Sequence, residues 1–374
     1  MNNPVKVLQI GNYPPPMCGW AIQTKLVTEE LRRRGQVCDV LKINENRQVK
    51  DPAYIDVQSG LDYLLKVVRY SLSGYRLNVH FNGQSKKGYW LALAAVLVGR
   101  LRLRPALVTF HGGLSQAYFP RHDSLSLHWG FKLLFALAGG IACDSDAVKR
   151  AIESYGIRPG KIEAIETFSS QYLEFQPVPL TPEQESFLDM HQPVVFSYVS
   201  FRPEYRLETL REAMSAFRKH HRRAGFVWLG FPGKEMAPAR QYIEGWNRDE
   251  QESLLLLGNL NHDQFLSLLT RCFAYVRTPA CDGVSASVLE SLALGIPVIA
   301  SENGTRPPGV ITYREEDAAE LCDRMLRLIE NREAVREELT NHAARSGDDN
   351  VGKMADWLTG VPPAIPREEV THAV

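Results

Sequence analysis

Several patterns that would define a class of protein are missing from this 374-residue sequence. None of its six cysteines belongs to a Cys-x-x-Cys pair, which argues against a zinc or disulfide framework. No run of eighteen apolar residues occurs, so no segment is predicted to span a membrane. The first residues lack the basic-then-apolar order of a signal peptide, and no short repeat recurs. We therefore expect a cytoplasmic globular protein that is not a solenoid.

Net charge is also missing, because 43 Lys and Arg balance 43 Asp and Glu. Residues 1–175 nevertheless hold 22 basic against 14 acidic side chains, a net of +8, and the remainder holds 21 against 29, a net of −8. The zero total argues against nucleic-acid binding. The basic first half suits anionic lipid headgroups or a phosphorylated substrate, and scattered solvated charge explains it equally well.

The first half of the chain alternates short apolar strands with longer amphipathic helices. Residues 5–10 predict a buried strand, a Gly/Pro loop follows, and residues 21–34 have the apolar spacing of a helix that stops at Gly35. Further strands are predicted at residues 37–43, 78–82, 106–110, 141–143 and 162–165. This order predicts a doubly wound parallel sheet of the Rossmann type.

A second alternation of strands and helices begins after a Pro-rich, polar stretch at 175–192, which we interpret as a linker. It continues from residue 193 to the final strand at 297–301. The sequence therefore predicts two Rossmann-like domains, at 1–175 and 190–345. Residues 346–374 are expected to form a C-terminal helix and tail, of which the helix could cross back to the first domain.

One stretch of the second half is the most informative. It runs from Asp282 through seven residues to Glu290 and continues as SLALGIPVIAS to Ser301. It resembles the E-x7-E region of the retaining glycosyltransferases of family 4, with Asp in place of the first Glu. The loop from Pro14 to Gly19 and the HGG at 111–113 lie in the matching order. The resemblance implies an α/β protein of the GT-B fold, with two Rossmann-like domains facing a central cleft, and a nucleotide-sugar donor.

Physical chemistry supports a donor site in this stretch. A diphosphate needs backbone N–H groups at a helix N-terminus, and small residues let it approach them closely. The small residues between the two acids are Gly283, Val284, Ser285, Ala286 and Ser287. We place Glu290 in the first turn of the helix, within reach of ribose hydroxyls, and Asp282 at the sugar end. The alternative is that both acids only complement the helix N-terminus.

Two loops of the first half complete the expected site. Gly19 follows the first strand, where a glycine lets a diphosphate or acceptor approach closely, and a structural turn explains it equally well. His111 directly follows a strand and would face the cleft. In the family a His in this loop holds the donor sugar, so the resemblance implies a catalytic role for His111 with Asp282. A locally paired loop histidine is the alternative, and the other nine histidines have no comparable placement.

The sequence departs from the family at the groups that neutralise the diphosphate. The family has an Arg and, about five residues later, a Lys after the first strand of the second domain, where this chain has Ser200 and Tyr205. Guanidinium groups suit phosphate well, and surface ion pairs are their other common use. The candidate replacements for donor binding are Arg202, Arg206, Lys234 and Arg277.

The resemblance implies transfer with retention of anomeric configuration through an oxocarbenium-like state. Catalysis would then rest on positioning and on electrostatic stabilisation of the departing diphosphate. The Asp-Ser-Asp at 144–146 has the letters of a metal-binding motif, but a helix cap followed by a first-turn acid explains it better. We predict no metal and no cofactor beyond the nucleotide-sugar co-substrate.

The sequence says less about the acceptor, which could be a glycan or a lipid-linked molecule. Residues 89–104 join an apolar stretch to three arginines. They could rest on the inner face of a membrane, as a peripheral contact, or form a core helix with a basic end.

Three classes of function remain open. The first is a hexosyltransferase-type enzyme in surface polysaccharide or glycolipid synthesis. The second is a non-catalytic relative that binds nucleotide or glycan for a partner enzyme, which the altered Arg and Lys positions favour. The third is a nucleotide-sugar epimerase of the same architecture, which the stretch from Asp282 to Glu290 disfavours.

Overall fold

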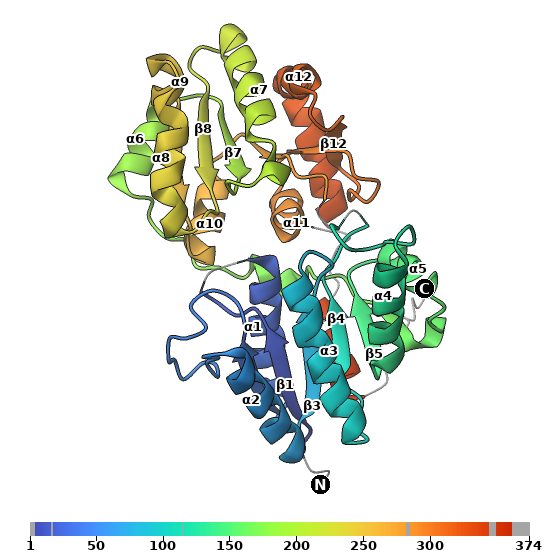
Figure 1. Cartoon of the computed structure of the whole chain (residues 1–374). Coiled ribbons are helices and arrows are strands. Elements are labelled where there is room, and N and C mark those ends of the chain that lie inside the picture. Colours follow the sequence, from blue (N-terminus) through green and yellow to red (C-terminus); the bar gives the residue numbers. More distant parts are fainter. Residues whose placement is uncertain (1–3, 16–17, 115, 282–284, 344–348, 361–374) are drawn as a thin grey trace, which may run out of the picture.

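The protein is described by a computed structural model that covers residues 4–15, 18–114, 116–281, 285–343 and 349–360. Two parallel sheets, each of six strands, form two α/β domains that lie one above the other (Figure 1). The expected fold class is confirmed. Among the described residues, no helix combines the length and the apolar character needed to cross a bilayer.

The first sheet has the strand order β2-β1-β3-β4-β5-β6. The strands expected from the apolar runs are all present, and they are almost entirely buried because helices cover both faces of a parallel sheet. Their bounds are β1 (Lys6–Gly11), β2 (Val37–Lys42), β3 (Arg76–Phe81), β4 (Leu107–Phe110), β5 (Gly140–Cys143) and β6 (Ile162–Ala164).

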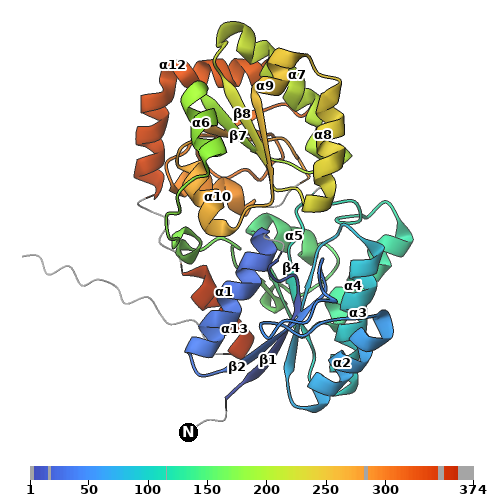
Figure 2. The ribbon, with the colours of Figure 1, turned by 90° about the vertical axis from the view of Figure 1, so that its left-hand side faces the viewer.

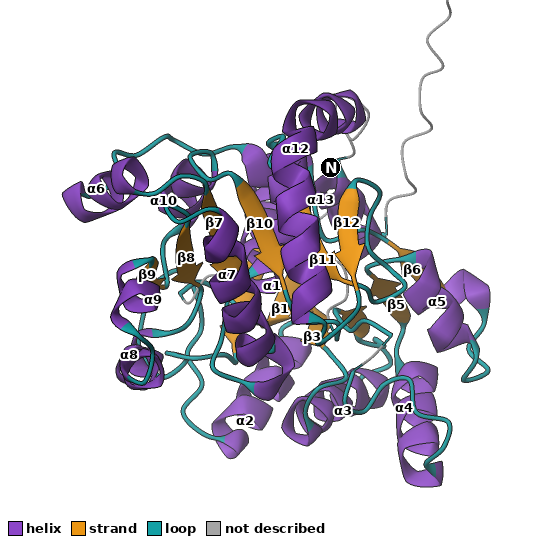
Figure 3. Ribbon diagram, turned by 90° about the horizontal axis from the view of Figure 1, so that it is seen from above, coloured by secondary structure: helices purple, strands orange, loops and turns teal. Residues whose placement is uncertain are grey.

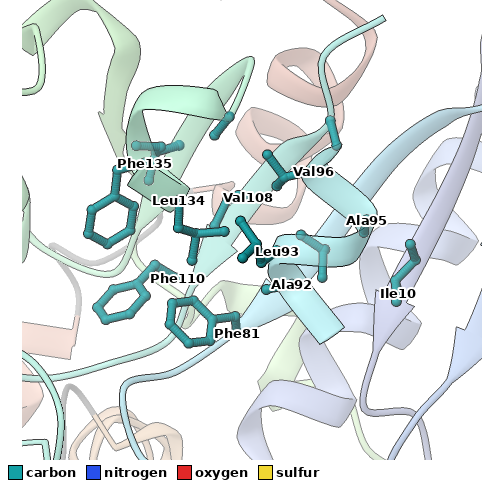
Figure 4. Packing of buried hydrophobic residues seen from close by; sticks show 14 of the residues in the cluster. Ile10, Phe81, Ala92, Leu93, Ala95, Val96, Val108, Phe110, Leu134 and Phe135 are labelled. Atoms are coloured by element: carbon teal, nitrogen blue, oxygen red, sulfur yellow. The ribbon is translucent and has the colours of Figure 1, made fainter. Parts of the chain in front are cut away.

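Helices cover this sheet on both sides. Figure 2 shows α1 and α13 on one side and α2, α3 and α4 on the other. Figure 4 shows the apolar core between the second group and the sheet, where Phe81, Phe110 and Phe135 pack against residues of α3. The elements are α1 (Gly19–Arg33), α2 (Gly60–Leu72), α3 (Lys86–Leu101), α4 (Leu125–Leu137), α5 (Asp146–Glu153), η1 (Pro159–Lys161), η2 (Ser170–Leu173) and α13 (Asn350–Thr359).

The second sheet has the strand order β12-β11-β10-β7-β8-β9. Its strands are β7 (Val194–Tyr198), β8 (Gly225–Leu229), β9 (Leu254–Gly258), β10 (Ala274–Arg277), β11 (Val298–Ser301) and β12 (Val310–Tyr313). In each domain the winding direction reverses once, between β1 and β3 and between β7 and β10. Ligands of open parallel sheets bind beside the carboxyl ends of the strands at such reversals.

The helices of the second domain cover both faces of its sheet, and Figure 3 shows α7 and α12 lying over it. Apolar clusters fill both interfaces. The elements are α6 (Pro182–Met190), η3 (Pro203–Tyr205), α7 (Leu207–His220), η4 (Gly233–Glu235), α8 (Met236–Glu244), α9 (Arg248–Glu252), α10 (His262–Leu269), α11 (Ala286–Ala293) and α12 (Ala318–Ala343).

The stretch interpreted as a linker, 175–192, contains the helix α6. Thr181 caps this helix, Pro182 is its first residue, and Gln184 closes a capping box with Thr181. Phe187 and Leu188 then pack into the core of the second domain. The interpretation as a linker was therefore wrong for this part of the stretch, because its Pro and polar residues form the N-terminal cap of α6.

The last described helix lies against the first domain, although it follows the second domain in the chain. Its residues Val351, Met354 and Leu358 pack with α1 and the first sheet. The Arg34 guanidinium donates to Asp356 Oδ1 at 2.6 Å. The chain therefore passes between the domains twice.

Candidate functional site

Two adjoining cavities lie between the domains, at the carboxyl ends of both sheets. The small cavity has a volume of about 180 Å³, and the large cavity has one of about 520 Å³. They share the lining residues Gly19, Tyr205, Arg277, Ser285 and Ala286. Residues from both domains therefore meet where the two cavities join.

The N-terminal ends of two helices face each other at this junction. Helix α1 begins at Gly19 and α11 begins at Ala286, and Figure 1 shows α11 at the boundary between the domains. A Cβ atom on Gly19 would lie 2.8 Å from the Ala286 Cβ, so only glycine permits this approach. Tyr172 holds the start of α1, because its hydroxyl donates to the Gly19 carbonyl at 3.1 Å. Two helix N-termini of partial positive charge form a ready site for an anion.

Arg277 lies beside this junction, as the last residue of β10. It is 6 % exposed and lines both cavities. Its Nη1 donates to the Tyr198 carbonyl at 3.2 Å, and its guanidinium lies 5.4 Å from the centre of the Tyr205 ring. Tyr205 stands where the related family has its Lys. A buried cation from the neighbouring strand therefore lies next to Tyr205, the position at which the resemblance leads us to expect a Lys.

The other three candidate cations lie elsewhere. Arg202 is exposed at the edge of the large cavity. Arg206 lines neither cavity, because its guanidinium pairs with Glu315 and Glu316 at 3.1 and 3.0 Å. Lys234 also lines neither cavity and reaches across to Glu45 of the first domain, at 2.6 Å. The structure thus brings Arg277 and Arg202 to the cleft and directs Arg206 and Lys234 to ion pairs.

Glu290 lines the small cavity and is 2 % exposed. Its Oε1 lies 2.7 Å from Nε2 of His262, the first residue of α10. Because α11 begins at Ala286, Glu290 lies in the second turn of this helix and not in the first turn, as we expected. Glu290 nevertheless lines the cavity, as do the loop residues Asn259 and Leu260.

The loop that precedes α11 contains four of the predicted site residues, from Asp282 to Ser285. Asp282, Gly283 and Val284 lie outside the described residues. Cys281 and Ser285, on either side of them, line the large cavity. Ser287 lines the small cavity, where its hydroxyl lies 2.9 Å from the Tyr275 hydroxyl.

His111 lines the large cavity from the first domain and belongs to a buried polar network. Its Nε2 lies 2.9 Å from His80 Nδ1, and His80 Nε2 lies 2.8 Å from Gln9 Oε1. Asn78 donates to the same Gln9 oxygen at 2.7 Å, which identifies this atom as the acceptor. Asn78 Nδ2 also lies 3.2 Å from His80 Nε2, so this nitrogen stands between a donor and an acceptor, and the direction of the contact between His80 and His111 depends on their tautomers. Trp20 stacks on the His111 ring, with the ring centres 4.8 Å apart.

The charges around His111 are set by burial. Burial lowers the pKa of His80 to about 3, and burial together with His80 lowers the pKa of His111 well below its usual value. Burial raises the pKa of Asp144 to about 7, although Thr167 donates to its Oδ1 at 2.6 Å. This oxygen lies 3.7 Å from His111 Nδ1. The contact joins a neutral imidazole to a carboxyl group that takes up a proton near neutral pH, so it is not an ion pair.

The Asp-Ser-Asp at 144–146 belongs to the start of a helix. Ser145 caps α5 by accepting from the Val148 N–H at 3.3 Å, and Asp146 lies in its first turn. Asp144 lines the large cavity instead. Among the described residues, no three His, Cys, Asp or Glu side chains cluster closely enough to hold a metal ion.

Three residues of the site had no role in our reading of the sequence. His80 lies within the apolar run of β3, and Trp20 is the second residue of α1, so neither position stood out in the sequence. For His262 a usable signal exists, because Asn261 and Gln264 form a capping box directly after β9. That signal places His262 at the carboxyl edge of the second sheet.

Comparisons with known proteins agree with this architecture. Residues 182–346 match the family model described as glycosyl transferases group 1. No curated protein matches the chain in sequence. HepE from Anabaena, solved in complex with UDP, is similar in structure with a TM-score of 0.70 and 14% identity, over 95% of this chain and 100% of that one.

Two further solved structures share the fold. Sucrose-phosphate synthase from Thermosynechococcus elongatus has a TM-score of 0.71 and 17% identity, over 95% of this chain and 99% of that chain. A Listeria monocytogenes protein assigned as a UDP-N-acetylglucosamine 2-epimerase has a TM-score of 0.64 and 14% identity, over 96% of each chain. The chain thus has the GT-B fold of these structures, and its residues 182–346 match the group 1 family of glycosyl transferases.

Proposed function

We propose that this protein is a glycosyltransferase that moves a sugar from a nucleoside diphosphate donor to a hydroxyl of a glycan or glycolipid acceptor, with retention of configuration. The observation that carries the proposal is the buried Arg277 beside the facing N-termini of α1 and α11. A fixed cation and two helix N-termini stabilise the negative charge of a diphosphate. This stabilisation is greatest when the bond between the diphosphate and the sugar breaks, because the charge on the diphosphate then increases.

The two cavities divide the substrates between them in this proposal. The small cavity takes the nucleoside, with the ribose hydroxyls at Glu290 and the base near Asn259. The large cavity takes the sugar and the acceptor hydroxyl. The first domain, 1–175, then holds the acceptor, and the second, 190–345, holds the donor. Known structures of this fold hold UDP in HepE from Anabaena and UDP-glucose in another crystal of the same protein, which supports a nucleotide diphosphate as donor.

His111 and Asp282 would contact the reacting sugar. A neutral imidazole can both donate and accept hydrogen bonds, so His111 suits a sugar hydroxyl, and its ring contacts Trp20 and His80. The bond between the anomeric carbon and the diphosphate breaks as the bond to the acceptor oxygen forms on the same face. The acceptor proton passes to the departing diphosphate, so no metal is required. The setting we propose is surface polysaccharide or glycolipid synthesis at the inner face of a membrane.

A non-catalytic binding subunit is the second candidate, and one observation favours it. Ser200 and Tyr205 replace the family's Arg and Lys, and Arg206 is held by Glu315 and Glu316. Such a protein would bind nucleotide without transferring or releasing sugar. Arg277 argues for the catalytic alternative, because it returns a buried cation to the diphosphate position.

Calorimetry with UDP, GDP and ADP tests the donor site. We expect saturable binding of one nucleotide and a loss of about 100-fold in affinity in Arg277→Ala, because a charged hydrogen-bond donor is removed from a buried site. Arg206→Ala is the matched control, since it removes an arginine that lines neither cavity. Equal binding by both variants contradicts the assignment of Arg277. Binding without turnover of any nucleotide sugar of that base supports the non-catalytic subunit.

A further inference from the structure

The helices on the outer side of the first sheet carry apolar side chains that face solvent. Large exposed hydrophobic residues recur at helical spacing in α2 (Leu61, Leu65, Leu72), in α3 (Trp90, Leu97, Leu101) and in α4 (Leu125, Trp129, Leu133). These positions face away from the buried positions of the same helices, such as Val67 in α2 and Phe131 in α4. The three helices adjoin one another on one side of the sheet (Figure 2). We call this surface the outer helical face.

The outer helical face collects nearly all such residues of the molecule. Of the 13 large hydrophobic side chains that are exposed in the described part of the chain, 11 lie between Leu61 and Leu133. Trp90 is 64 % exposed and Trp129 is 58 % exposed. Scattered exposed hydrophobic residues need no explanation, but a concentration on adjacent helices indicates an interaction surface.

The same segment has acidic residues only near its two ends, at Asp62 and Asp123. Residues 63–122 contain nine Lys and Arg and no Asp or Glu. Lys86, Lys87, Arg100, Arg102 and Lys132 belong to α3, α4 or their ends, and within the described residues none of them pairs with a carboxylate. Lys132 lies over the Trp129 ring at 4.9 Å. Exposed Trp and Leu flanked by unpaired cations suit the headgroup region of an anionic bilayer.

An apolar pocket opens on this face next to the cleft. It lies between α3 and α4, has a volume of about 320 Å³, and is lined by Phe81, Tyr89, Trp90, Leu127 and Phe131 among others. Ser85 lines both this pocket and the large cavity. The pocket therefore lies directly beside the place where we propose that the acceptor binds.

We propose that the outer helical face lies on an anionic lipid bilayer and that the pocket between α3 and α4 receives a hydrocarbon chain of an anionic acceptor lipid. The charge of the face argues against a second copy of this chain as occupant, because two such faces would bring unpaired cations together. The bilayer contact stands independently of the enzyme's activity. The role of the pocket in holding the acceptor rests on the proposed function.

Co-sedimentation of the full-length protein with vesicles tests the bilayer contact. We expect binding to vesicles that contain phosphatidylglycerol, weaker binding to pure phosphatidylcholine, and release by salt. Replacing both tryptophans (Trp90→Ser with Trp129→Ser) is expected to weaken binding by about tenfold or more, since both apolar anchors are lost. Met190→Ser, an exposed apolar residue of the second domain, is the matched control and is expected to bind as the wild type does.

Charge variants separate the two forces that hold the face to the bilayer. Lys86→Gln and Lys87→Gln are each expected to weaken binding by about fivefold at low salt and to have little effect at high salt. The control, Lys219→Gln with Arg222→Gln in the second domain, leaves binding unchanged. Failure of the wild type to bind anionic vesicles overturns the proposal. A dimer in light scattering that the tryptophan variant dissociates also overturns it, because the face would then serve self-association.

The pocket is tested with dodecyl phosphate, a single chain with an anionic end, used below its critical micelle concentration. We expect one saturable site in calorimetry that is lost in Ser126→Phe, which fills the pocket, and kept in Leu125→Phe, whose side chain faces solvent. Equal binding by the two variants overturns the role of the pocket. Nucleotide binding by both variants serves as the folding control, so a failed donor site and a failed lipid site are told apart.

Discussion

The two domains present different chemistry to the same cleft. The second domain contributes charge: the Arg277 cation and the carboxylate of Glu290. The first domain contributes neutral groups on a polar network that crosses three strands, from Gln9 through Asn78 and His80 to Thr109. A charged edge suits a diphosphate and its ribose, whereas neutral acceptors and donors suit sugar hydroxyls. The comparison therefore indicates which edge holds which part of the donor.

Removing the carboxylate of the second domain is expected to have the largest effect. In Glu290→Ala the nucleotide affinity should fall by about 100- to 1000-fold, because hydrogen bonds from two ribose hydroxyls to one charged group are lost. Calorimetry with the bound nucleotide and with its 2′-deoxy analogue measures this. The variant should no longer distinguish the two compounds. If it still prefers the ribonucleotide, the ribose lies elsewhere. His262→Gln, which keeps a hydrogen bond to Glu290, serves as the control.

The stability of the first domain is expected to depend on pH through Asp144, which lines the large cavity. The pKa of Asp144 is about 7 in the folded protein, against an ordinary value of 3.8, so its protonated form stabilises the folded state, and this stabilisation is lost as pH rises toward 7. Between pH 7 and pH 5, the wild type should gain about 2 to 3 kcal/mol of unfolding free energy relative to Asp144→Asn.

Urea unfolding of both proteins at several pH values measures this difference. The lowered pKa values of His80 and His111 act in the opposite direction, since that stability is lost as pH falls below 6.5. Both proteins share this loss, so it cancels in the difference. A difference that does not vary with pH shows that Asp144 stays ionised in the cavity.

The contact between the N-termini of α1 and α11 can be tested with two compensating substitutions. In Gly19→Ala the new methyl group meets the Ala286 Cβ and forces the helix ends apart, so nucleotide affinity should fall by about tenfold. Adding Ala286→Gly removes the opposing methyl group and should restore most of the affinity. A double variant as weak as Gly19→Ala alone shows that the contact between the helix ends does not position the site.

The smallest effect on nucleotide affinity is expected at Lys234, which lies outside both cavities. Lys234→Ala removes an exposed ion pair with Glu45 that joins the two domains outside both cavities. Such pairs contribute about 0 to 1 kcal/mol, so nucleotide affinity should change by no more than about fivefold. A double-mutant cycle with Glu45→Ala measures the coupling. A much larger loss of nucleotide affinity would indicate that Lys234 belongs to the donor site.

The sequence was sufficient for the fold and for part of the site. Parallel strands bury both faces, so their apolar runs were visible, and the loops after them, at Gly19 and His111, lie at the cleft. The sequence could not show which of the four candidate cations lies at the donor site. Whether Arg206 is free depends on Glu315, which is 109 residues away in the chain. The same holds for His262 and Glu290, which are 28 residues apart and meet through the packing of α10 beside α11.

The return of α13 to the first domain restricts how the two halves can move. Asn350 donates to the Ser169 hydroxyl and to the Phe168 carbonyl, at 3.0 and 2.7 Å, so the outgoing and returning segments lie side by side. Because Asn350 is held next to Ser169 in the first domain, we expect the two domains to move mainly by rotation about this place. Such a rotation would open the cleft to a donor and, on closing, would return Arg277 to the same helix end.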